Sequence, residues 1–307
     1  MTLNWGLARK RRALTARAEI IGGIRRFFHG EGFLEVETPL RIPAPAPEYN
    51  IDAVPSGDWY LHTSPELAMK RLLATGFGPI YQICRCWREG ERGRLHLPEF
   101  TMLEWYRSDA DYHSLMDDCR ALISSVAMAV GLGDTVVYQG NRIALGGKWE
   151  RITVEEAFSR YTRYSMEDAL GKGLFDEQMV AEIEPRLGLE APVFIHDYPA
   201  SQGALARLKA DNPDVAERFE LYIGGVEIAN AFSELVDPVE QRARFIREGE
   251  FRRSFGKRDY PLPERFLEEL PHMPPSAGIA LGLDRLVMVL LDASSIDEVV
   301  AFTPEEL

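Results

Sequence analysis

The hydrophobic and polar positions along the chain predict helices in three long segments. Residues 10–29 place apolar side chains three to four positions apart with basic residues between them, which is the spacing of one face of a helix. A similar pattern recurs at residues 111–130. Residues 238–270 also favour helices, but they carry many more charges and therefore predict helices with largely solvated surfaces.

Shorter apolar runs bounded by turn residues predict strands. They lie at residues 33–39, 59–62, 79–89, 99–107, 193–199, 218–223 and 226–235, and the segment 276–293 reads as a strand, a turn and a helix. Gly224 and Gly225 separate two of these runs, as in a tight hairpin. Because successive strands are linked by hairpins and helices flank them, we expect an α+β fold with a mostly antiparallel sheet flanked by helices.

Three further segments complete this outline. TSPELAMKRLLATG (63–76) predicts a short helix that Ser64 caps, that Pro65 begins and that Gly76 ends. PAPAPEY (43–49) is too rich in proline for a helix or a central strand, so it is expected to be a loop, either ordered or mobile. Residues 136–189 predict a short hairpin and one or two amphipathic helices, without a chemical motif.

Length and composition limit the class of protein. The chain has 307 residues, of which 46% are apolar, so by length alone one domain is as plausible as two. No apolar stretch approaches the roughly 20 residues that span a bilayer, and the N-terminus lacks the apolar core of a signal peptide. We therefore expect a soluble, cytoplasmic protein with no membrane partner.

Charge and cysteine content narrow the class of partner and of site. The net charge of −13 opposes non-specific attraction to phosphate backbones, although basic stretches occur at 9–12 and 242–258. Of the three cysteines, Cys84 and Cys86 alternate with other residues in an expected strand. This spacing indicates neither a disulfide framework nor a zinc site, so all three are interpreted as buried or idle thiols.

The strand at 99–107 carries the first candidate chemistry. Its period of two places Phe100, Met102, Glu104 and Tyr106 on one face. An aromatic ring, a carboxylate and a phenol on one face can stack a base and hold an ammonium group. The alternative is an ordinary solvent-facing carboxylate among strand aromatics.

The preceding strand and loop offer a cluster of donors. Arg88 ends the strand, and Arg92, Arg94 and His96 follow in the loop. Together they could bind a polyphosphate, although a solvated basic loop would have the same composition.

Two expected strands, 218–223 and 226–235, carry Glu220, Glu227 and Glu234 among apolar residues, with Asn230 between the latter two. Carboxylates on inner strands are costly unless a cation or a metal pairs with them. Magnesium is a suitable partner for Glu220 and Glu227, and pairing with arginines is the alternative. Since Asn230 and Glu227 would point to opposite faces of a regular strand, we expect a bulge near Ala229.

The segment 276–293 places glycines and a cation at a turn between a strand and a buried helix. Gly278 and Gly282 let a ligand approach the backbone, and Arg285 adds a fixed positive charge near the start of the helix. The pattern indicates a site for a phosphate tail. The alternative is a surface arginine on a core helix.

Taken in order, three stretches resemble motifs 1, 2 and 3 of the class II aminoacyl-tRNA synthetases. They are GFLEVETP (32–39), CRCWREGERGRLHLPEFTMLEWYR (84–107) and GIALGLDRL (278–286). TSPELAMKRL and RFELYIGGVEIANAFSEL resemble the lysyl enzyme, and the resemblance runs from about residue 10 over nearly the whole chain. It leaves no room for the N-terminal OB-fold that reads the anticodon, so residues 1–307 are expected to form a single catalytic domain. In this the chain resembles the elongation factor P–(R)-β-lysine ligase family.

The resemblance implies a role for each residue that matches a motif. Arg88 would grip the α-phosphate of ATP and Arg285 the γ-phosphate, which makes these two the catalytic residues. His96 would contact the phosphate tail and Phe100 would stack on adenine. The nucleotide site would also include Ile228 and Gly282, and Glu220 and Glu227 would bind Mg²⁺.

The same resemblance implies a site for a diamino acid. Ser64 and Glu66 would meet its amino-acid end, and its ammonium groups and carboxylate would contact Glu104, Tyr106, Asn230 and Glu234. Ala280 stands where lysyl-tRNA synthetases typically have glycine, so it would add a methyl group to the pocket wall.

Two positions depart from the family pattern. Arg88 is followed by Glu89, Gly90 and Glu91, so the carboxylate expected near the adenine amine is displaced by one position. Leu97 replaces an asparagine and removes one polar contact. Both departures bear on ligand recognition.

The implied reaction has two steps. ATP and (R)-β-lysine, or lysine, form an aminoacyl-adenylate and pyrophosphate, and a lysine of elongation factor P then takes the aminoacyl group; the adenylate phosphate or a site glutamate could accept its proton. Motif 1 implies a homodimer. A ligase that charges tRNA or a small acceptor is an alternative, which the net charge of −13 disfavours. A non-catalytic sensor is a second alternative, but such paralogues usually lose the phosphate-binding arginines and here both are present.

Overall fold

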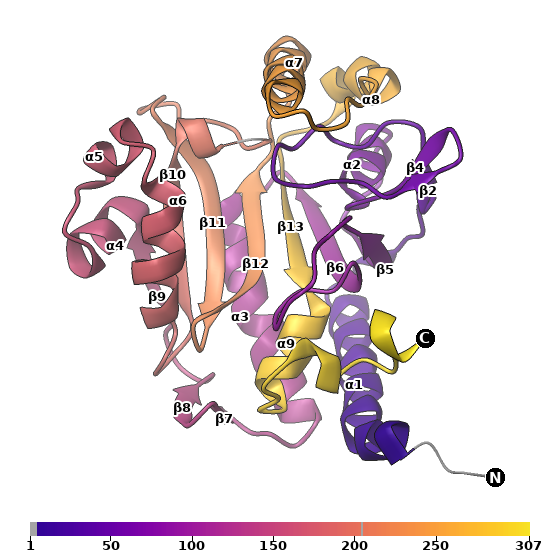
Figure 1. The fold of residues 1–307 in the computed structure, drawn as a ribbon, viewed down its shortest axis with the longest axis vertical. Coiled ribbons are helices and arrows are strands. Elements are labelled where there is room, and N and C mark those ends of the chain that lie inside the picture. Colours follow the sequence, from indigo (N-terminus) through magenta and orange to yellow (C-terminus); the bar gives the residue numbers. More distant parts are fainter. Residues whose placement is uncertain (1–4, 204) are drawn as a thin grey trace.

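The protein is described by a computed structural model, and the structure describes residues 5–203 and 205–307. Its centre is an eight-stranded sheet with the order β1-β5-β6-β13-β12-β11-β10-β9 (Figure 1). The strands are β1 (Leu34–Glu35), β5 (Ile80–Trp87), β6 (Glu99–Ser108), β9 (Glu150–Thr153), β10 (Val193–Pro199), β11 (Val215–Ile223), β12 (Val226–Ser233) and β13 (Ser276–Gly282). Only the outermost pairs, β1 with β5 and β9 with β10, are parallel. The expected α+β fold with a mostly antiparallel sheet is confirmed.

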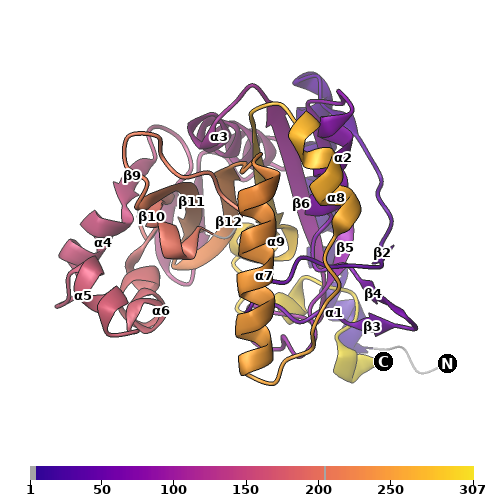
Figure 2. The same ribbon diagram turned by 90° about the horizontal axis from the view of Figure 1, so that it is seen from above.

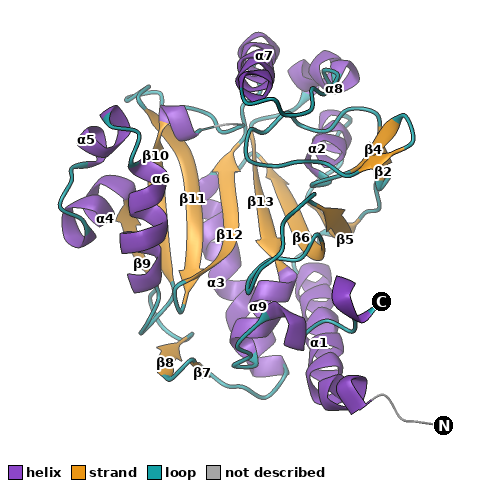
Figure 3. Ribbon diagram, in the orientation of Figure 1, coloured by secondary structure: helices purple, strands orange, loops and turns teal. Residues whose placement is uncertain are grey.

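Two small sheets lie beside the large one. One has the order β2-β4-β3, and the other pairs β7 with β8. Their strands are β2 (Arg41–Ile42), β3 (Pro55–Ser56), β4 (Trp59–Leu61), β7 (Thr135–Tyr138) and β8 (Asn141–Ala144). Figure 3 separates these strands from the loops that join them.

Helices flank the large sheet, and the principal core lies on one side of it. The helices are α1 (Trp5–Gly30), α2 (Glu66–Ala74), α3 (Tyr112–Ala129), α4 (Val154–Tyr161), α5 (Met166–Gly171), α6 (Phe175–Gln178), α7 (Pro238–Ser254), α8 (Glu264–Glu269) and α9 (Leu283–Leu290). Ile24 of α1, Leu122 of α3, Trp105 of β6 and Leu286 of α9 belong to one buried cluster. Figure 2 shows α7 on the opposite side of the sheet from α3. The face that α7 overhangs is therefore the one left for a ligand.

The sequence patterns predicted most of these elements. The helices expected at 10–29 and 111–130 are α1 and α3, and the hairpin expected at Gly224 and Gly225 joins β11 to β12. These glycines have φ angles of 62° and 74°, which favour residues without a side chain. A Cβ atom at Gly224 would also lie 2.6 Å from Tyr138 Cδ1, so packing requires glycine there as well.

Two predictions differ from the structure. The strand expected at 33–39 is reduced to Leu34 and Glu35, because only these two residues pair with β5 before the chain turns away towards Pro39. The segment 136–189 contains the expected hairpin and amphipathic helices, but also β9, which joins the edge of the large sheet. A strand of four residues is too short to give a clear periodic signal.

Among residues 5–203 and 205–307, no helix combines the length and the apolar character needed to cross a bilayer.

Candidate active site

A cavity of about 810 Å³ lies on the face of the sheet away from the core that contains α3. All but one of the site residues predicted from the sequence line it: Ser64, Glu66, Arg88, His96, Phe100, Glu104, Tyr106, Glu220, Glu227, Ile228, Asn230, Ala280, Gly282 and Arg285. The exception is Glu234, which is buried next to this cavity. The structure thus brings together residues from four strands, the loop after β5, and the starts of α2 and α9.

Strand register explains how such distant residues meet. Glu220 pairs with Asn230, Asn230 with Ala280, and Ala280 with Glu104, so these four form one row across β11, β12, β13 and β6. Residues in register across neighbouring strands point to the same face of a sheet. The row therefore forms the floor of the cavity.

The bulge expected near Ala229 is present at the adjacent residue. Leu221 pairs with Ala229 and Tyr222 pairs with Glu227, which leaves Ile228 without a partner in β11. One extra residue reverses the alternation of side chains. As a result Glu227 and Asn230 both line the cavity.

Arg285 is held at one end of the cavity by three groups. Its guanidinium donates to Glu227 Oε2 at 2.9 Å, to His96 Nε2 at 2.6 Å and to the carbonyl oxygen of Leu95 at 3.2 Å. Burial and the charge of Arg285 lower the pKa of His96, so this imidazole is a neutral acceptor. These contacts hold the cation at this end of the cavity.

Arg88 has donor capacity that the protein does not use. Its guanidinium carbon lies 5.1 Å from the centre of the Phe100 ring, and its Nη1 is 3.9 Å from Glu91 Oε1. Its Nε is buried and makes no hydrogen bond to the described part of the chain. A buried N–H without an acceptor is costly, and a phosphate oxygen would satisfy it.

The displaced carboxylate of the family pattern is Glu91. Gly90 adopts a φ of 78°, and the chain turns there so that Glu91 lines the cavity. Glu89 instead pairs with Arg258 at 3.1 Å on an exposed surface. One carboxylate is therefore still available beside the expected position of the base.

The residues proposed for Mg²⁺ lie in an acidic cluster. Glu220 Oε2 accepts hydrogen bonds of 2.7 Å from both Tyr198 and Tyr222, and burial raises its pKa. Burial, followed by the charges of Glu220 and Glu227, raises the pKa of Glu184 to about 7. Carboxylate oxygens are the ligands that Mg²⁺ prefers, so Glu220 and Glu227 fit the expected ion by their chemistry. The arginine pairing weighed as the alternative is also present, since Glu220 pairs with Arg218 and Glu227 with Arg285.

At the amino-acid end, Glu104 is the centre of a hydrogen-bond network. Ser64 donates to its Oε1 at 2.6 Å and Tyr106 donates to its Oε2 at 2.9 Å. The side chain is 1% exposed, and burial raises its pKa well above the usual range. The carboxyl group is thus oriented by two hydroxyl groups and shielded from solvent.

Glu234 lies behind the cavity wall formed by Gly278. A Cβ atom at Gly278 would overlap both the Tyr106 ring and Glu234 Oε1, so only glycine fits between this carboxylate and the cavity. Glu234 forms an ion pair with Lys70, and its Oε1 receives no hydrogen bond from the residues that the structure describes. Burial raises its pKa to about 8, against the opposing effect of Lys70.

Sequence reasoning missed two cations in the site. Lys70 is 1% exposed and is shared by Glu66 and Glu234, and its position four residues after Glu66 on α2 was an available signal. Arg218 donates to Asn230 Oδ1 at 3.0 Å and also pairs with Glu220. It precedes Glu220 by two residues, which places both on one face of β11.

The proline-rich loop is an ordered wall of the cavity. The side chain of Arg252 is fully buried and donates to the carbonyl oxygens of Glu48 at 2.6 Å and Ile51 at 2.8 Å. The Tyr49 ring lies 4.4 Å from that of Phe251. Helix α7 therefore fixes this loop over the site.

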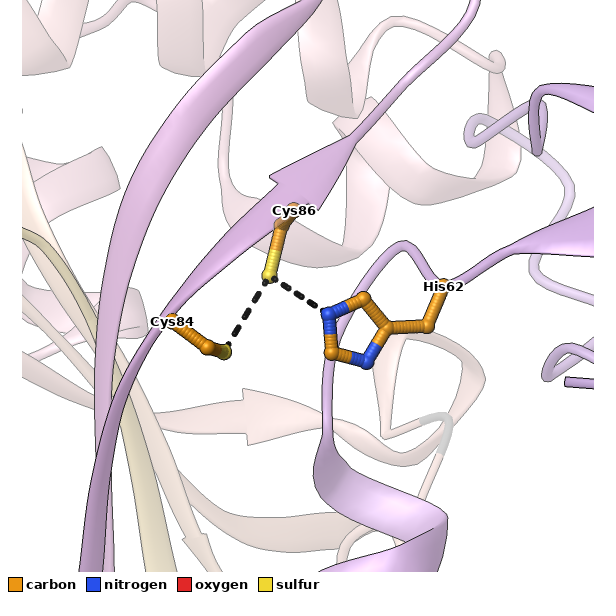
Figure 4. A group of neighbouring side chains, drawn as sticks. All are labelled: His62, Cys84 and Cys86. Carbon is orange, nitrogen blue, oxygen red and sulfur yellow. Dashed lines mark hydrogen bonds between the residues drawn. The ribbon is translucent and has the colours of Figure 1, made fainter. Parts of the chain in front are cut away.

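The interpretation of the cysteines as buried or idle thiols did not anticipate one feature of the structure. The thiols are free and Cys119 is buried, as expected. Cys84 and Cys86, however, lie with His62 in a group whose potential ligand atoms are all within 4.8 Å of one another (Figure 4). The spacing of the cysteines alone did not reveal it, because the histidine comes from a different segment.

Comparisons with known proteins agree with this geometry. A family model described as tRNA synthetases class II (D, K and N) matches residues 3–306. The elongation factor P–(R)-β-lysine ligase of Hamiltonella defensa is 39% identical, covering 98% of both chains. That of Proteus mirabilis is 40% identical over 94% of both chains. The lysine–tRNA ligase of Magnetococcus marinus is 39% identical over 95% of this chain, but over only 64% of its own length.

Proposed function

Since this chain belongs to the class II tRNA synthetase family of the D, K and N type, we propose that it attaches (R)-β-lysine, or lysine, to a lysine side chain of elongation factor P at the expense of ATP. It is a ligase. Relatives named for this activity align with it over 94% to 98% of their own lengths. The observation that carries the proposal is one cavity that joins two arginines suited to phosphate, Arg88 with a buried donor that lacks an acceptor in the described chain and Arg285, to an acidic pocket for ammonium groups.

The first step joins the amino acid to the nucleotide. The substrate carboxylate attacks the α-phosphorus, an O–P bond forms, and the bond to pyrophosphate breaks. Arg88 is suited to stabilise the negative charge that develops on the α-phosphate, because its buried Nε–H has no hydrogen-bond acceptor in the described part of the chain. Arg285 would bind the phosphate tail with His96 beside it.

The carboxylates proposed for magnesium are Glu220 and Glu227. When bound, Mg²⁺ would supply positive charge that offsets the negative charge of the phosphate oxygens. Glu227 is now paired with Arg285 at 2.9 Å. We expect Arg285 to turn from Glu227 to the phosphate tail on nucleotide binding, so that each cation meets an anion.

The amino-acid end selects a diamine by charge. Glu66 and Glu234 share one buried cation, Lys70, while Glu104 is bonded to the hydroxyl groups of Ser64 and Tyr106. The pocket therefore has more acidic groups than basic ones. Two ammonium groups on the ligand would balance this excess. A substrate with a single ammonium would leave a buried carboxyl unpaired, which is unfavourable.

In the second step the amine of the acceptor lysine attacks the acyl carbon. The bond to AMP breaks, an amide forms, and the amine loses a proton. Both steps take place in one catalytic domain, and a cytoplasmic location is part of the same proposal. Because the acceptor is a protein, no recognition of tRNA is required.

A ligase that charges tRNA is the second candidate. It is favoured by the lysine–tRNA ligase of Magnetococcus marinus, which is as similar in identity, at 39%, as several of the protein ligases. The net charge of −13 opposes it, since tRNA is a polyanion.

Pyrophosphate exchange tests the activation step. We expect exchange that requires Mg²⁺ and either β-lysine or lysine, and that fails with a neutral amino acid of similar size. Arg88→Ala and Arg285→Ala should each cost about 2 to 5 kcal/mol of transition-state stabilisation, the range for truncated buried charge pairs. Near-normal exchange in either variant would refute the site, and no exchange in the wild type would favour a non-catalytic paralogue.

A further inference from the structure

We propose that His62, Cys84 and Cys86 form a zinc site beside the active-site cavity. It is separate from the magnesium site, since none of its three residues lines that cavity.

The two distances that Cys86 Sγ makes to the other ligand atoms are close to those of a tetrahedral zinc site. The sulfurs of Cys84 and Cys86 are 3.9 Å apart, and Cys86 Sγ is 3.8 Å from His62 Nε2. Around a tetrahedral zinc ion with bonds of about 2.3 Å to sulfur and 2.0 Å to nitrogen, two sulfurs lie roughly 3.8 Å apart and a sulfur and a nitrogen roughly 3.6 Å apart. With all three ligand atoms within 4.8 Å of one another, only small adjustments would be needed to bind one ion (Figure 4).

The backbone holds these ligands in place. Cys84 and Cys86 pair with Met102 and Phe100 in β6, so they share one face of a strand that is paired with β6 along its whole length. Trp87 N–H donates to the His62 carbonyl oxygen at 3.0 Å, which fixes the chain after β4 against the end of β5. Ligands held by paired backbone lose little conformational freedom when a metal binds.

A fourth ligand is available on the same strand. Gln82 precedes Cys84 by two residues, so it points to the same face of β5. It is 2% exposed, and its Oε1 accepts no hydrogen bond from the described part of the chain. A buried amide oxygen without a donor is an unfavourable feature that a cation would relieve.

Binding requires a defined exchange of protons. His62 Nε2 now donates to the carbonyl oxygen of Arg85 at 2.7 Å, so its proton resides on Nε2. To ligate zinc, the imidazole adopts the other neutral tautomer and gives up this hydrogen bond. Two thiols become thiolates, so one zinc ion replaces two protons and no oxidant or reductant is needed.

The ligand set favours zinc over the alternatives. Two thiolates and an imidazole are soft to borderline donors, whereas magnesium prefers oxygen. A disulfide would need the sulfurs to approach from 3.9 Å to about 2.05 Å between alternate residues of a paired strand. Because Cys84 is only partly buried, a small ion can reach the group from that side.

Metal titration tests the proposal on the full chain. Metal-free protein is titrated with Zn²⁺ against a chromophoric chelator, and separately with Co²⁺ to detect thiolate-to-cobalt charge transfer. We expect one tight equivalent and a charge-transfer band. Loss of an outer-shell partner alone costs roughly 10- to 100-fold in metal affinity, so Cys84→Ser should weaken binding at least that much. Cys119→Ser is the matched control and should bind as the wild type does.

Thermal unfolding gives a second measurement. Zinc should raise the Tm of the wild type and of Cys119→Ser, but not that of Cys84→Ser or His62→Gln, because a ligand that binds only the native state stabilises it. The proposal is overturned if wild-type protein with Co²⁺ shows no charge-transfer band. It is equally overturned if Cys84→Ser retains the wild-type affinity for zinc. Loss of tight zinc binding in Glu227→Gln alone would also overturn it, because the ion would then lie in the active-site cavity.

Discussion

Glu234 shows at the residue scale how the protein prepares a charged pocket before the substrate arrives. Burial raises its pKa to about 8, although Lys70 lies beside it. Lys70 is shared with Glu66, so one cation serves two carboxyl groups. At neutral pH the cluster therefore holds a proton that an arriving ammonium group would displace.

This displacement predicts a pH dependence of substrate binding. A carboxyl group with a raised pKa is neutral below that pKa and charged above it, and an ammonium ligand binds the charged form. The Kd of β-lysine should therefore increase by up to about tenfold for each pH unit below 8. Calorimetry between about pH 6 and 8 measures this. Norleucine, which lacks the second ammonium, should show a weaker dependence, and a flat profile for β-lysine would contradict the role of Glu234.

Ala280 is the residue at which we expect the two isomers of lysine to be distinguished. It lies in register between Asn230 and Glu104 and lines the cavity, so its methyl group faces the ligand. One methyl group in a pocket is worth about 1 to 3 kcal/mol, or roughly 10- to 200-fold in specificity. We predict that kcat/KM is higher for β-lysine than for α-lysine, and that Ala280→Gly lowers the ratio of these two values.

A variant on the other face of the same strand is the control. Ala277 is fully buried in the core, so Ala277→Gly should lower stability and leave the isomer ratio unchanged. An equal ratio in wild type and Ala280→Gly would make Ala280 a packing residue, and a wild-type preference for α-lysine would overturn the choice of substrate.

At this scale the sequence predicted those site residues that belong to a motif or to one face of a strand, such as Phe100, Glu104 and Arg285. It was uninformative where residues meet only through tertiary packing. His62 lies 24 positions before Cys86, and no local period links the two. Lys70 could have been paired with Glu66 by helical spacing, but its second partner, Glu234, is visible only in the fold.

Among the elements, α7 and the proline-rich loop form a pair that closes the site. Arg252 of α7 is fully buried and pairs with Asp52 at 2.7 Å as well as with two loop carbonyl groups. Arg253, next in the chain, makes an exposed ion pair with Asp259. Adjacent arginines thus provide a buried and an exposed pair for comparison.

We predict that Arg252→Met lowers the free energy of unfolding by about 3 to 5 kcal/mol, because it leaves a carboxylate and buried carbonyl groups unpaired. It should also raise the KM for ATP or the amino acid, since the loop is part of the cavity wall. Arg253→Met should cost less than about 1 kcal/mol, as exposed pairs do. Urea denaturation measures both, and equal losses would show that Arg252 does not anchor the loop.

The elements themselves were largely predictable because the long ones have a clear period. The second half of helix α1 buries Ile20, Ile24 and Phe28, and the β5–β6 hairpin is paired along its length, and this produces the pattern in the sequence. The length of the strand after α1 was overestimated. Apolar alternation over 33–39 shows that a strand can form, but not that a neighbouring strand is present to pair with it. The bulge at Ile228 was anticipated from the conflict between Glu227 and Asn230.

For the whole molecule, motif 1 still predicts a homodimer. The edge strand β1 carries Leu34, which is 51% exposed, and the nearby Leu40 is 42% exposed. Apolar side chains on an edge strand favour burial against another chain. Light scattering at micromolar concentration should give the mass of a dimer, and Leu34→Asp should weaken association. Val239→Asp, on an exposed apolar residue of α7, should not, and a monomeric wild type would contradict the prediction.

The charges of the molecule also bear on the acceptor. The basic stretch 242–258 is largely neutralised within the chain, as Arg242 pairs with Glu264 and Arg244 with Glu240. It therefore offers less attraction to a polyanion such as tRNA than the sequence alone implied.

The identity of the acceptor is the most direct test of this account. The enzyme is incubated with Mg²⁺, ATP and radiolabelled β-lysine, with either purified elongation factor P or lysine-accepting tRNA, and the product is then exposed to mild alkali. We predict label on a lysine of elongation factor P that resists alkali, as an amide does, and little label on tRNA. Alkali-labile label on tRNA, with elongation factor P unmodified, would contradict the proposed function.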